Sequence, residues 1–257
     1  MPDTACLLIH GFTSSPFEME PIARALAGAG VRVHSVLLPG HGTTLADLDA
    51  TTFADWVAAA EAAFLDLRRA VARVSVVGMS LGGSIGLALA ERHDPAALMT
   101  IATPVYLYRL FPWEGTDRRL PLVRFLRHVR PLWPARRHTP EELAIAPFQG
   151  YEGVTPLNAL WSFIQGLKAV RRDLPRITCP LLAVHCPTDA TTPPGNAQAI
   201  LDGVSSMEKR VEYPRITETV TNHHKLTTHR ETRDQIAAWA VELVMGGAQG
   251  VGEGETG

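Results

Sequence analysis

The sequence predicts an α/β fold, in which a mostly parallel β-sheet is covered by helices on both faces. Short apolar runs typical of buried strands alternate along the chain with longer runs of helical spacing. The chain has 257 residues, of which 46% are hydrophobic and 19% charged, so it suits one large globular domain or two small ones. This composition excludes a disordered or fibrous protein.

The first part of the chain carries the clearest alternation. Strands are expected at residues 5–9, 31–36, 74–77 and 97–101. Helices are expected at residues 17–29, from Phe53 onward and at residues 81–93. The helix at Phe53 is the most regular, because Thr52 and Asp55 can form a capping pair and apolar residues recur at helical spacing through Leu67. The third helix should stop before Asp94-Pro95, since proline disfavours a helical residue before it.

Residues 104–175 interrupt this alternation with prolines, aromatic residues and a few short helical patterns, the clearest at residues 157–171. We interpret them as an inserted helical cap, which leaves residues 1–103 and 176–245 as the core. The alternation then resumes. Strands are expected at residues 181–185 and 210–213, and helices at residues 195–201 and 231–244. Residues 246–257 contain six glycines and predict a disordered tail.

The charges and the hydropathy exclude several classes of partner. With 24 basic and 26 acidic residues the net charge is −2, so no overall field attracts nucleic acid. The longest uncharged stretch has seventeen residues, fewer than the ~20 of a spanning helix. We therefore expect no integral membrane association. The N-terminus shows no secretory signal, so a cytoplasmic location is expected by default.

The cysteine and histidine spacings point away from metal and redox chemistry. Cys6, Cys179 and Cys186 cannot form a closed set of disulfides and predict buried thiols in a reducing compartment. The sequence contains no C-x-x-C pair and no H-E-x-x-H motif. We expect no metal site and no cofactor.

The sequence Gly78-Met79-Ser80-Leu81-Gly82 matches the G-x-S-x-G turn in which a serine becomes a nucleophile. A predicted strand ends just before it and a predicted helix follows. Glycines suit both flanks because a Cβ there would collide with neighbouring backbone. Such a turn would place the Ser80 hydroxyl at a helix N-terminus, where a developing anion is favoured. The alternative is a glycine-rich turn with a capping serine.

Activation of a serine requires a base and an acid that orients it. In hydrolases built on this turn the chain order is Ser, then Asp or Glu, then His. That order leaves His223, His224 and His229 as candidate bases and favours Asp189, which follows the strand at 181–185. A solvated turn aspartate is the alternative for Asp189.

An oxyanion hole should combine the backbone N–H of Leu81, which follows the nucleophile, with an N–H from the loop after the first strand. His10-Gly11-Phe12 forms that loop, and the Phe12 N–H is the expected donor. A simple turn that ends the strand is the alternative.

Five segments together resemble the bacterial carboxylesterase and monoacylglycerol lipase group of the α/β-hydrolases. They are residues 8–16, 39–43, 51–56, 78–83 and 193–197. The resemblance implies the α/β-hydrolase fold and supports Asp189 as the triad acid. In these relatives the catalytic histidine is followed by two residues and then Thr, which fits His224 and places His223 one position early. His223 and a solvated or metal-binding histidine cluster remain the alternatives, and residues 214–221 are about six residues longer than usual, a length that could displace this loop.

The resemblance also assigns roles in the cap. Family caps lie over the acyl pocket, so aromatic and aliphatic cap residues are candidates for its lining, with the cap's own small core as the alternative. They are Leu107, Leu110, Phe111, Trp113, Phe125, Trp133, Phe148, Trp161 and Phe163. Among these we expect Phe111, Trp113 and Trp161 to bind substrate. Glu152 resembles the cap glutamate that binds glycerol hydroxyls in monoacylglycerol lipases.

Residues 104–138 are strongly basic, with eight arginines, no lysine and only two acidic residues, Glu114 and Asp117. A solvated arginine-rich helix face explains this pattern. The alternatives are steering of an anionic substrate and transient contact with an anionic lipid surface.

The sequence thus predicts a serine hydrolase that cleaves small-molecule carboxylic esters with short to medium acyl chains, with monoacylglycerols as candidates, through an acyl-enzyme. Two alternatives stay open. One is an acyltransferase or thioesterase acting on a specialised acyl donor, and the other is a non-catalytic ligand-binding protein of the same fold.

Overall fold

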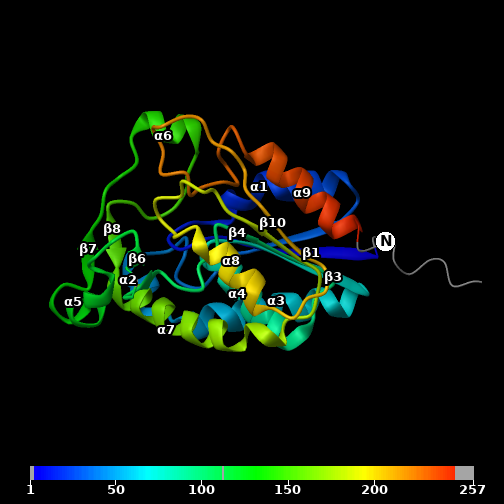
Figure 1. The fold of residues 1–257 in the computed structure, drawn as a ribbon, viewed down its shortest axis with the longest axis horizontal. Coiled ribbons are helices and arrows are strands. Elements are labelled where there is room, and N and C mark those ends of the chain that lie inside the picture. The colour runs from blue at the N-terminus through cyan, green and yellow to red at the C-terminus, as the bar shows by residue number, and fades with distance from the viewer. Residues whose placement is uncertain (1–2, 112, 247–257) are drawn as a thin grey trace, which may run out of the picture.

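The computed structural model describes residues 3–111 and 113–246, and its centre is a six-stranded parallel sheet (Figure 1). The strand order is β10-β9-β4-β3-β1-β2, and every pair of neighbours is parallel. The strands are β1 (Thr4–Ile9), β2 (Arg32–Val36), β3 (Arg73–Met79), β4 (Leu98–Ile101), β9 (Leu181–Val184) and β10 (Lys209–Glu212). The predicted parallel sheet is confirmed.

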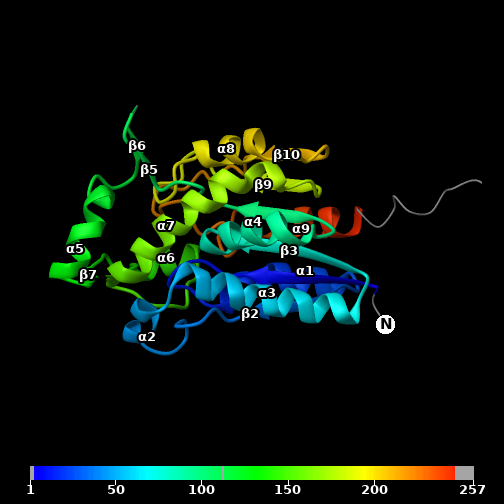
Figure 2. The ribbon, with the colours of Figure 1, turned by 90° about the horizontal axis from the view of Figure 1, so that it is seen from below.

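Helices cover both faces of this sheet, as predicted (Figure 2). One face carries α1 (Glu20–Gly28) and α9 (Arg233–Gly246), and the other carries α3 (Phe53–Ala70), α4 (Leu81–His93) and α8 (Gly195–Gly203). Alternate residues of a strand serve the two cores, because successive side chains point to opposite faces. Leu7 and Ile9 belong to the core under α3 and α4, whereas Cys6 and Leu8 belong to the core under α1 and α9.

Before residue 104, two helices begin with a capping box. At α3 the Thr52 hydroxyl accepts the Asp55 N–H, and the Asp55 carboxylate accepts the Thr52 N–H, as expected. The same arrangement of Thr44 and Asp47 begins α2 (Leu45–Ala50), a helix that we did not predict. Its Thr-x-x-Asp spacing was the available signal.

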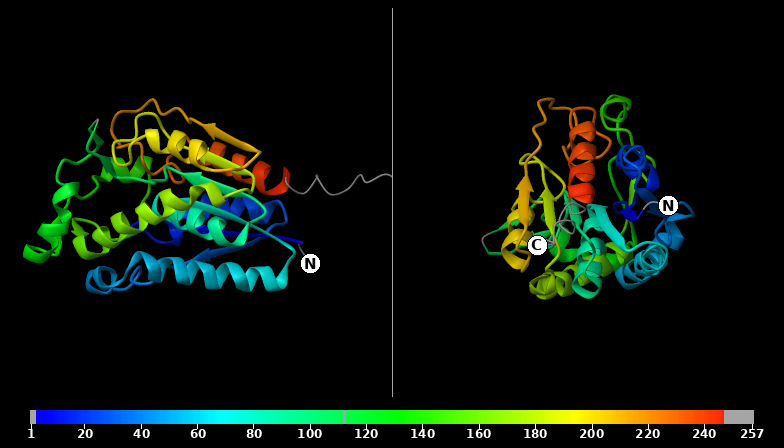
Figure 3. Two further views of the ribbon diagram at one scale, coloured as in Figure 1. Left: turned by 60° about the horizontal axis from the view of Figure 1, so that its bottom comes forward. Right: turned by 90° about the vertical axis from the view of Figure 1, so that its right-hand side faces the viewer.

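Residues 104–175, here called the cap segment, contribute no strand to the six-stranded sheet within the described residues. Their elements are β5 (Tyr108–Arg109), β6 (Glu114–Gly115), α5 (Val123–Val129), β7 (Leu132–Pro134), α6 (Pro140–Ile145), β8 (Val154–Pro156) and α7 (Leu157–Asp173), with short 3₁₀ turns at Leu120–Leu122 and Leu174–Arg176. The β7–β8 pair and α5 lie beyond the carboxyl ends of the strands, and α7 runs back beside α4 (Figure 3).

Element boundaries differ from the prediction mainly at helix ends. The helix expected at 17–29 is a 3₁₀ turn, Pro16–Met19, followed by α1, which has a proline in its own first turn. Helix α9 includes Gly246, which corrects the start of the predicted tail, and residues 247–257 lie outside the described residues. No helix in the described parts of the chain combines the length and apolar character needed to span a membrane.

Candidate active site

Ser80 is the single residue between the end of β3 and the start of α4. It has a backbone conformation that residues other than glycine rarely adopt (φ 52°, ψ −115°). A hydrogen bond from its N–H to the Ile101 carbonyl oxygen (2.8 Å) helps to hold this conformation. A Cβ on Gly78 would collide with the backbone of Gly82, and one on Gly82 would collide with the Ile9 carbonyl. The glycines around Ser80 are therefore required by packing, as the motif predicts.

Ser80, His224 and Asp189 form one chain of hydrogen bonds. The Ser80 hydroxyl donates to Nε2 of His224 (3.0 Å), and Nδ1–H of His224 donates to Oδ2 of Asp189 (2.7 Å). The three residues follow β3, β9 and β10, whose carboxyl ends lie at one edge of the sheet. Parallel pairing thus brings together three residues that are far apart along the chain.

Asp189 is buried, and both oxygens of its carboxylate accept hydrogen bonds. Its Oδ1 accepts the N–H groups of Thr191 (2.7 Å) and Thr192 (3.0 Å), and Nε2 of the buried His185 lies 3.3 Å from Oδ2. Burial alone would raise the pKa of this carboxyl, but the charge of His224 and the hydrogen bonds from His185 and His224 lower it to about 2. Asp189 is therefore an anion at neutral pH.

The Asp189 carboxylate also determines the protonation behaviour of His224. Burial disfavours the imidazolium, but attraction to Asp189 outweighs burial and raises the pKa of His224 above its usual value. With Nδ1 donating to Asp189, Nε2 of the neutral ring is free to accept from Ser80. This is the tautomer that a general base needs.

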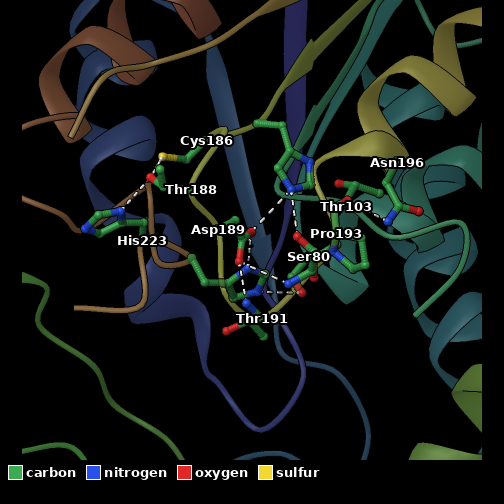
Figure 4. Close-up of polar contacts among 12 residues, drawn as sticks. Ser80, Thr103, Cys186, Thr188, Asp189, Thr191, Pro193, Asn196 and His223 are labelled. Atoms are coloured by element: carbon green, nitrogen blue, oxygen red, sulfur yellow. Dashed lines mark hydrogen bonds and ion pairs between the residues drawn. The ribbon is translucent and has the colours of Figure 1, made fainter. Parts of the chain in front are cut away.

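His223 faces away from Ser80, toward Thr188 and Cys186 (Figure 4). Its Nδ1 lies 2.7 Å from the Thr188 hydroxyl, and its Nε2 lies 2.9 Å from the Glu218 carbonyl oxygen. The Glu218 side chain also accepts from Thr221 and from Nε2 of His229 (3.0 Å). Glu218 belongs to the long stretch 214–221, so that stretch braces the loop and does not displace it.

A cleft of about 380 Å³ opens next to Ser80 and His224. Apolar and aromatic side chains from both parts of the chain line it: Phe12, Leu107, Leu120, Phe148, Tyr151, Leu160 and Phe163. Its charged lining residues are Glu18, Asp117, Arg136, Glu152 and Lys225. The cleft thus combines an apolar wall, a serine with a base, and several charged groups.

Sequence comparison agrees with this arrangement. Residues 6–239 match the alpha/beta hydrolase family. The chain belongs to this family. This α/β-hydrolase is 35% identical over 206 residues to a thermostable monoacylglycerol lipase of Bacillus sp. (strain H-257), covering 80% of this chain and 78% of that protein. It is 22% identical to a carboxylesterase of Bacillus subtilis over 82% of each chain. The resemblance seen in the sequence is confirmed.

Solved structures show the same fold. The structure reported for LipS and LipT, two metagenome-derived lipolytic enzymes, superposes with a TM-score of 0.82 at 25% identity, covering 95% of this chain and 94% of that one. The monoacylglycerol lipase of Paleococcus ferrophilus gives a TM-score of 0.73 at 16% identity, with coverage of 95% and 94%. At 16% identity, the similarity to the Paleococcus ferrophilus enzyme shows a shared fold only.

Of the two expected oxyanion donors of this α/β-hydrolase, Leu81 directly follows Ser80 and Phe12 lines the same cleft as Ser80. Leu81 is the first residue of α4, where backbone N–H groups have no acceptor within the helix. Phe12 lines the cleft in the loop after β1. The neighbouring Gly11 N–H is occupied, because it donates to the Glu18 carboxylate (2.7 Å).

Three expected substrate-binding residues, Phe111, Trp113 and Trp161, do not line the cleft, which corrects that assignment. Phe111 is 95% exposed, Trp113 stacks on Tyr108, and Trp161 packs against the cap segment's own small core. Residue type alone cannot tell which way a cap side chain points.

Glu152 does line the cleft, where its carboxylate contacts Nδ1 of His138. Four charged lining residues were not assigned to the cleft from the sequence: Glu18, Asp117, Arg136 and Lys225. Burial raises the pKa of the Glu18 carboxyl and lowers the pKa of the Lys225 ammonium to about 8. The available signal for Lys225 was its position directly after His224.

Proposed function

We propose that this α/β-hydrolase is a serine hydrolase that cleaves carboxylic esters through an acyl-enzyme. The single observation that carries the proposal is the hydrogen-bonded series Ser80, His224, Asp189 at the mouth of an apolar cleft. The similarity to a monoacylglycerol lipase and a carboxylesterase supports ester substrates.

In this mechanism Ser80 Oγ attacks the ester carbonyl while Nε2 of His224 takes its proton. Asp189 stabilises the imidazolium, and the N–H groups of Phe12 and Leu81 hold the oxyanion. His224 then protonates the leaving alcohol. Water enters, loses a proton to His224 and releases the acid from Ser80 by the same route.

We propose esters with short to medium acyl chains as substrates, with monoacylglycerols among them. The cleft volume of about 380 Å³ lies at the small end of the ~300–1,000 Å³ of ligand pockets. Its aromatic wall suits an acyl chain. Glu152, at the cap side of the cleft, is our candidate for binding alcohol hydroxyls.

We propose that residues 104–175 act as a cap that touches lipid surfaces transiently. Several large apolar side chains of this segment are exposed: Leu110, Phe111, Leu122, Phe125 and Val129. Arginines lie over its aromatic rings, such as Arg124 over Phe125 (4.4 Å) and Arg130 over Trp133 (6.0 Å). Apolar groups among arginines fit an anionic lipid surface. Phe111→Ser should weaken sedimentation with anionic vesicles, and unchanged sedimentation would contradict this contact.

We also propose a reducing, cytoplasmic location. It is supported by Cys6, Cys179 and Cys186, which are all unpaired and buried. Cell fractionation would test it, and recovery from an oxidising compartment would contradict it.

The activity is tested with a fluorophosphonate probe and p-nitrophenyl esters. Wild type should be labelled and should turn over, whereas Ser80→Ala should lose labelling and several orders of magnitude in kcat. Ser205→Ala, which removes a serine hydroxyl that donates to the Pro175 carbonyl oxygen, is the matched control. An unlabelled wild type would indicate a ligand-binding protein. Preference for thioesters or alcohol acceptors would indicate a thioesterase or an acyltransferase.

A further inference from the structure

Lys225 is a cation in the wall of the cleft that forms no hydrogen bond or ion pair among the described residues. Its side chain is largely buried, with the whole residue only 7% exposed. Its Nζ has no hydrogen-bond partner among the described residues and lies 4.9 Å from the centre of the Phe148 ring, which lines the same cleft. The Phe148 ring offers a cation–π contact but no hydrogen-bond acceptor. Burying an ammonium without an acceptor costs free energy, so such a group is unusual without a function.

The nearby acidic groups do not supply the missing partner, because each one is engaged elsewhere. Glu18 accepts the Gly11 N–H, and its burial favours the neutral carboxyl. Glu142 pairs with Arg136 (2.8 Å), and Glu152 contacts His138. Among the described residues no carboxylate lies within ion-pair distance of Lys225 Nζ.

The position of Lys225 connects it to the reaction. It directly follows His224, and Arg136 lines the cleft on the cap side. Lys225 and Ser80 line the same cleft, so an anionic group that reaches the nearly inaccessible Nζ would share the cleft with an ester held at Ser80. An anionic oxygen there would gain a charge-assisted hydrogen bond from a buried ammonium.

We infer that Lys225 is an anion subsite, and that the preferred substrates are esters that carry a second, anionic group such as a carboxylate or a phosphate. This inference rests on the proposed serine hydrolase function and names its substrate class. The neutral esters considered above would leave Lys225 without a partner.

Two matched pairs of substrates test the inference. The first pair places the charge on the acyl side: p-nitrophenyl hydrogen suberate against p-nitrophenyl octanoate. The second pair places it on the alcohol side: a monoacylglycerol phosphate against the same monoacylglycerol. For each pair the readout is the ratio of kcat/KM for the anionic ester to that for the neutral ester, which cancels any general effect on the triad.

Lys225→Met should reduce this ratio at least about tenfold in one of the two pairs, as expected for a lost charge-assisted hydrogen bond. Lys168→Met is the control. It removes the same charge from the exposed side of α7, outside the cleft, and should leave the ratio within about twofold. The pair that responds tells which side of the ester carries the anion.

A measurement on wild type alone covers the case in which Lys225→Met does not fold. The anionic-to-neutral ratio should decline as the pH rises through about 8, where Lys225 loses its charge. A ratio that is independent of both pH and Lys225 in both pairs overturns the inference. If neutral esters are then still hydrolysed in a Ser80-dependent way, the proposed function stands. Loss of that dependence would instead overturn the proposed function.

Discussion

The carboxyl edge of the main sheet and the cap segment are held by different kinds of contact. At the edge, the last residues of four strands are aligned across the sheet: Met79 beside Ile101, Ile101 beside Val184, and Val184 beside Glu212. Two of the loops that hold the catalytic candidates leave from these aligned ends, and Ser80 follows the third. The cap segment has short strands, short helices and a small core of its own, with Phe111 almost fully exposed.

The comparison shows that the sequence alone places a side chain well only where strand pairing fixes the backbone. Strand pairing and buried glycines leave one position for Ser80, and a loop after a known strand end has little freedom. In the cap segment aromatic residues pack inward, stack on a neighbour or face solvent, as Trp161, Trp113 and Phe111 do.

The largest effect should come from the edge of the sheet. Asp189→Asn removes the anion that orients His224 and should lower kcat about 10⁴-fold on a neutral p-nitrophenyl ester. His223→Gln changes a neighbouring imidazole that faces away from Ser80 and should cost less than about tenfold. If His223→Gln proved as damaging as Asp189→Asn, His223 would replace His224 as the base.

The close packing of Gly82 behind Ser80 should not tolerate an added side-chain atom. Gly82→Ala places a Cβ against the Ile9 and His10 carbonyl oxygens and should destabilise the fold by about 3 kcal/mol or more. Gly28→Ala is the matched control, because a Cβ there meets nothing within 4 Å. Thermal unfolding of both variants measures the difference. Equal stability would show that the backbone at the edge can shift.

The pH profile tests the electrostatic link between Asp189 and His224. The base must be neutral, so kcat/KM for a neutral ester should fall about tenfold per pH unit below the pKa of His224. Attraction to Asp189 raises that pKa above its usual value. The loss of activity on acidification should therefore have its midpoint above the ~6.5 of an unperturbed histidine. A half-maximal activity well below this pH would mean that burial outweighs Asp189.

The smallest effects should separate the two kinds of cap residue. Phe163 lines the cleft and stacks between Phe12 and Phe53, so Phe163→Ala should lower kcat/KM for p-nitrophenyl octanoate about tenfold. Phe111→Ala removes an exposed ring and should change it less than about twofold. A large effect of Phe111→Ala in solution would show that the cap segment folds over the ester.

Much of the core and the three triad candidates could be read from residue patterns. Alternating strand and helix signals, the capping pair at Thr52 and Asp55, and the G-x-S-x-G turn are local features, so neighbours along the chain suffice to interpret them. The chain order Ser, then Asp or Glu, then His in hydrolases with this turn then led to Asp189 and the late histidines.

The resemblance favoured His224 over His223, but only the three-dimensional structure shows that the two adjacent imidazoles point in different directions, His224 to Ser80 and His223 to Thr188. The same holds for the exposed Phe111 and for Lys225, whose Nζ is buried without a partner. Side-chain direction and desolvation depend on contacts between distant segments, and no local pattern encodes them.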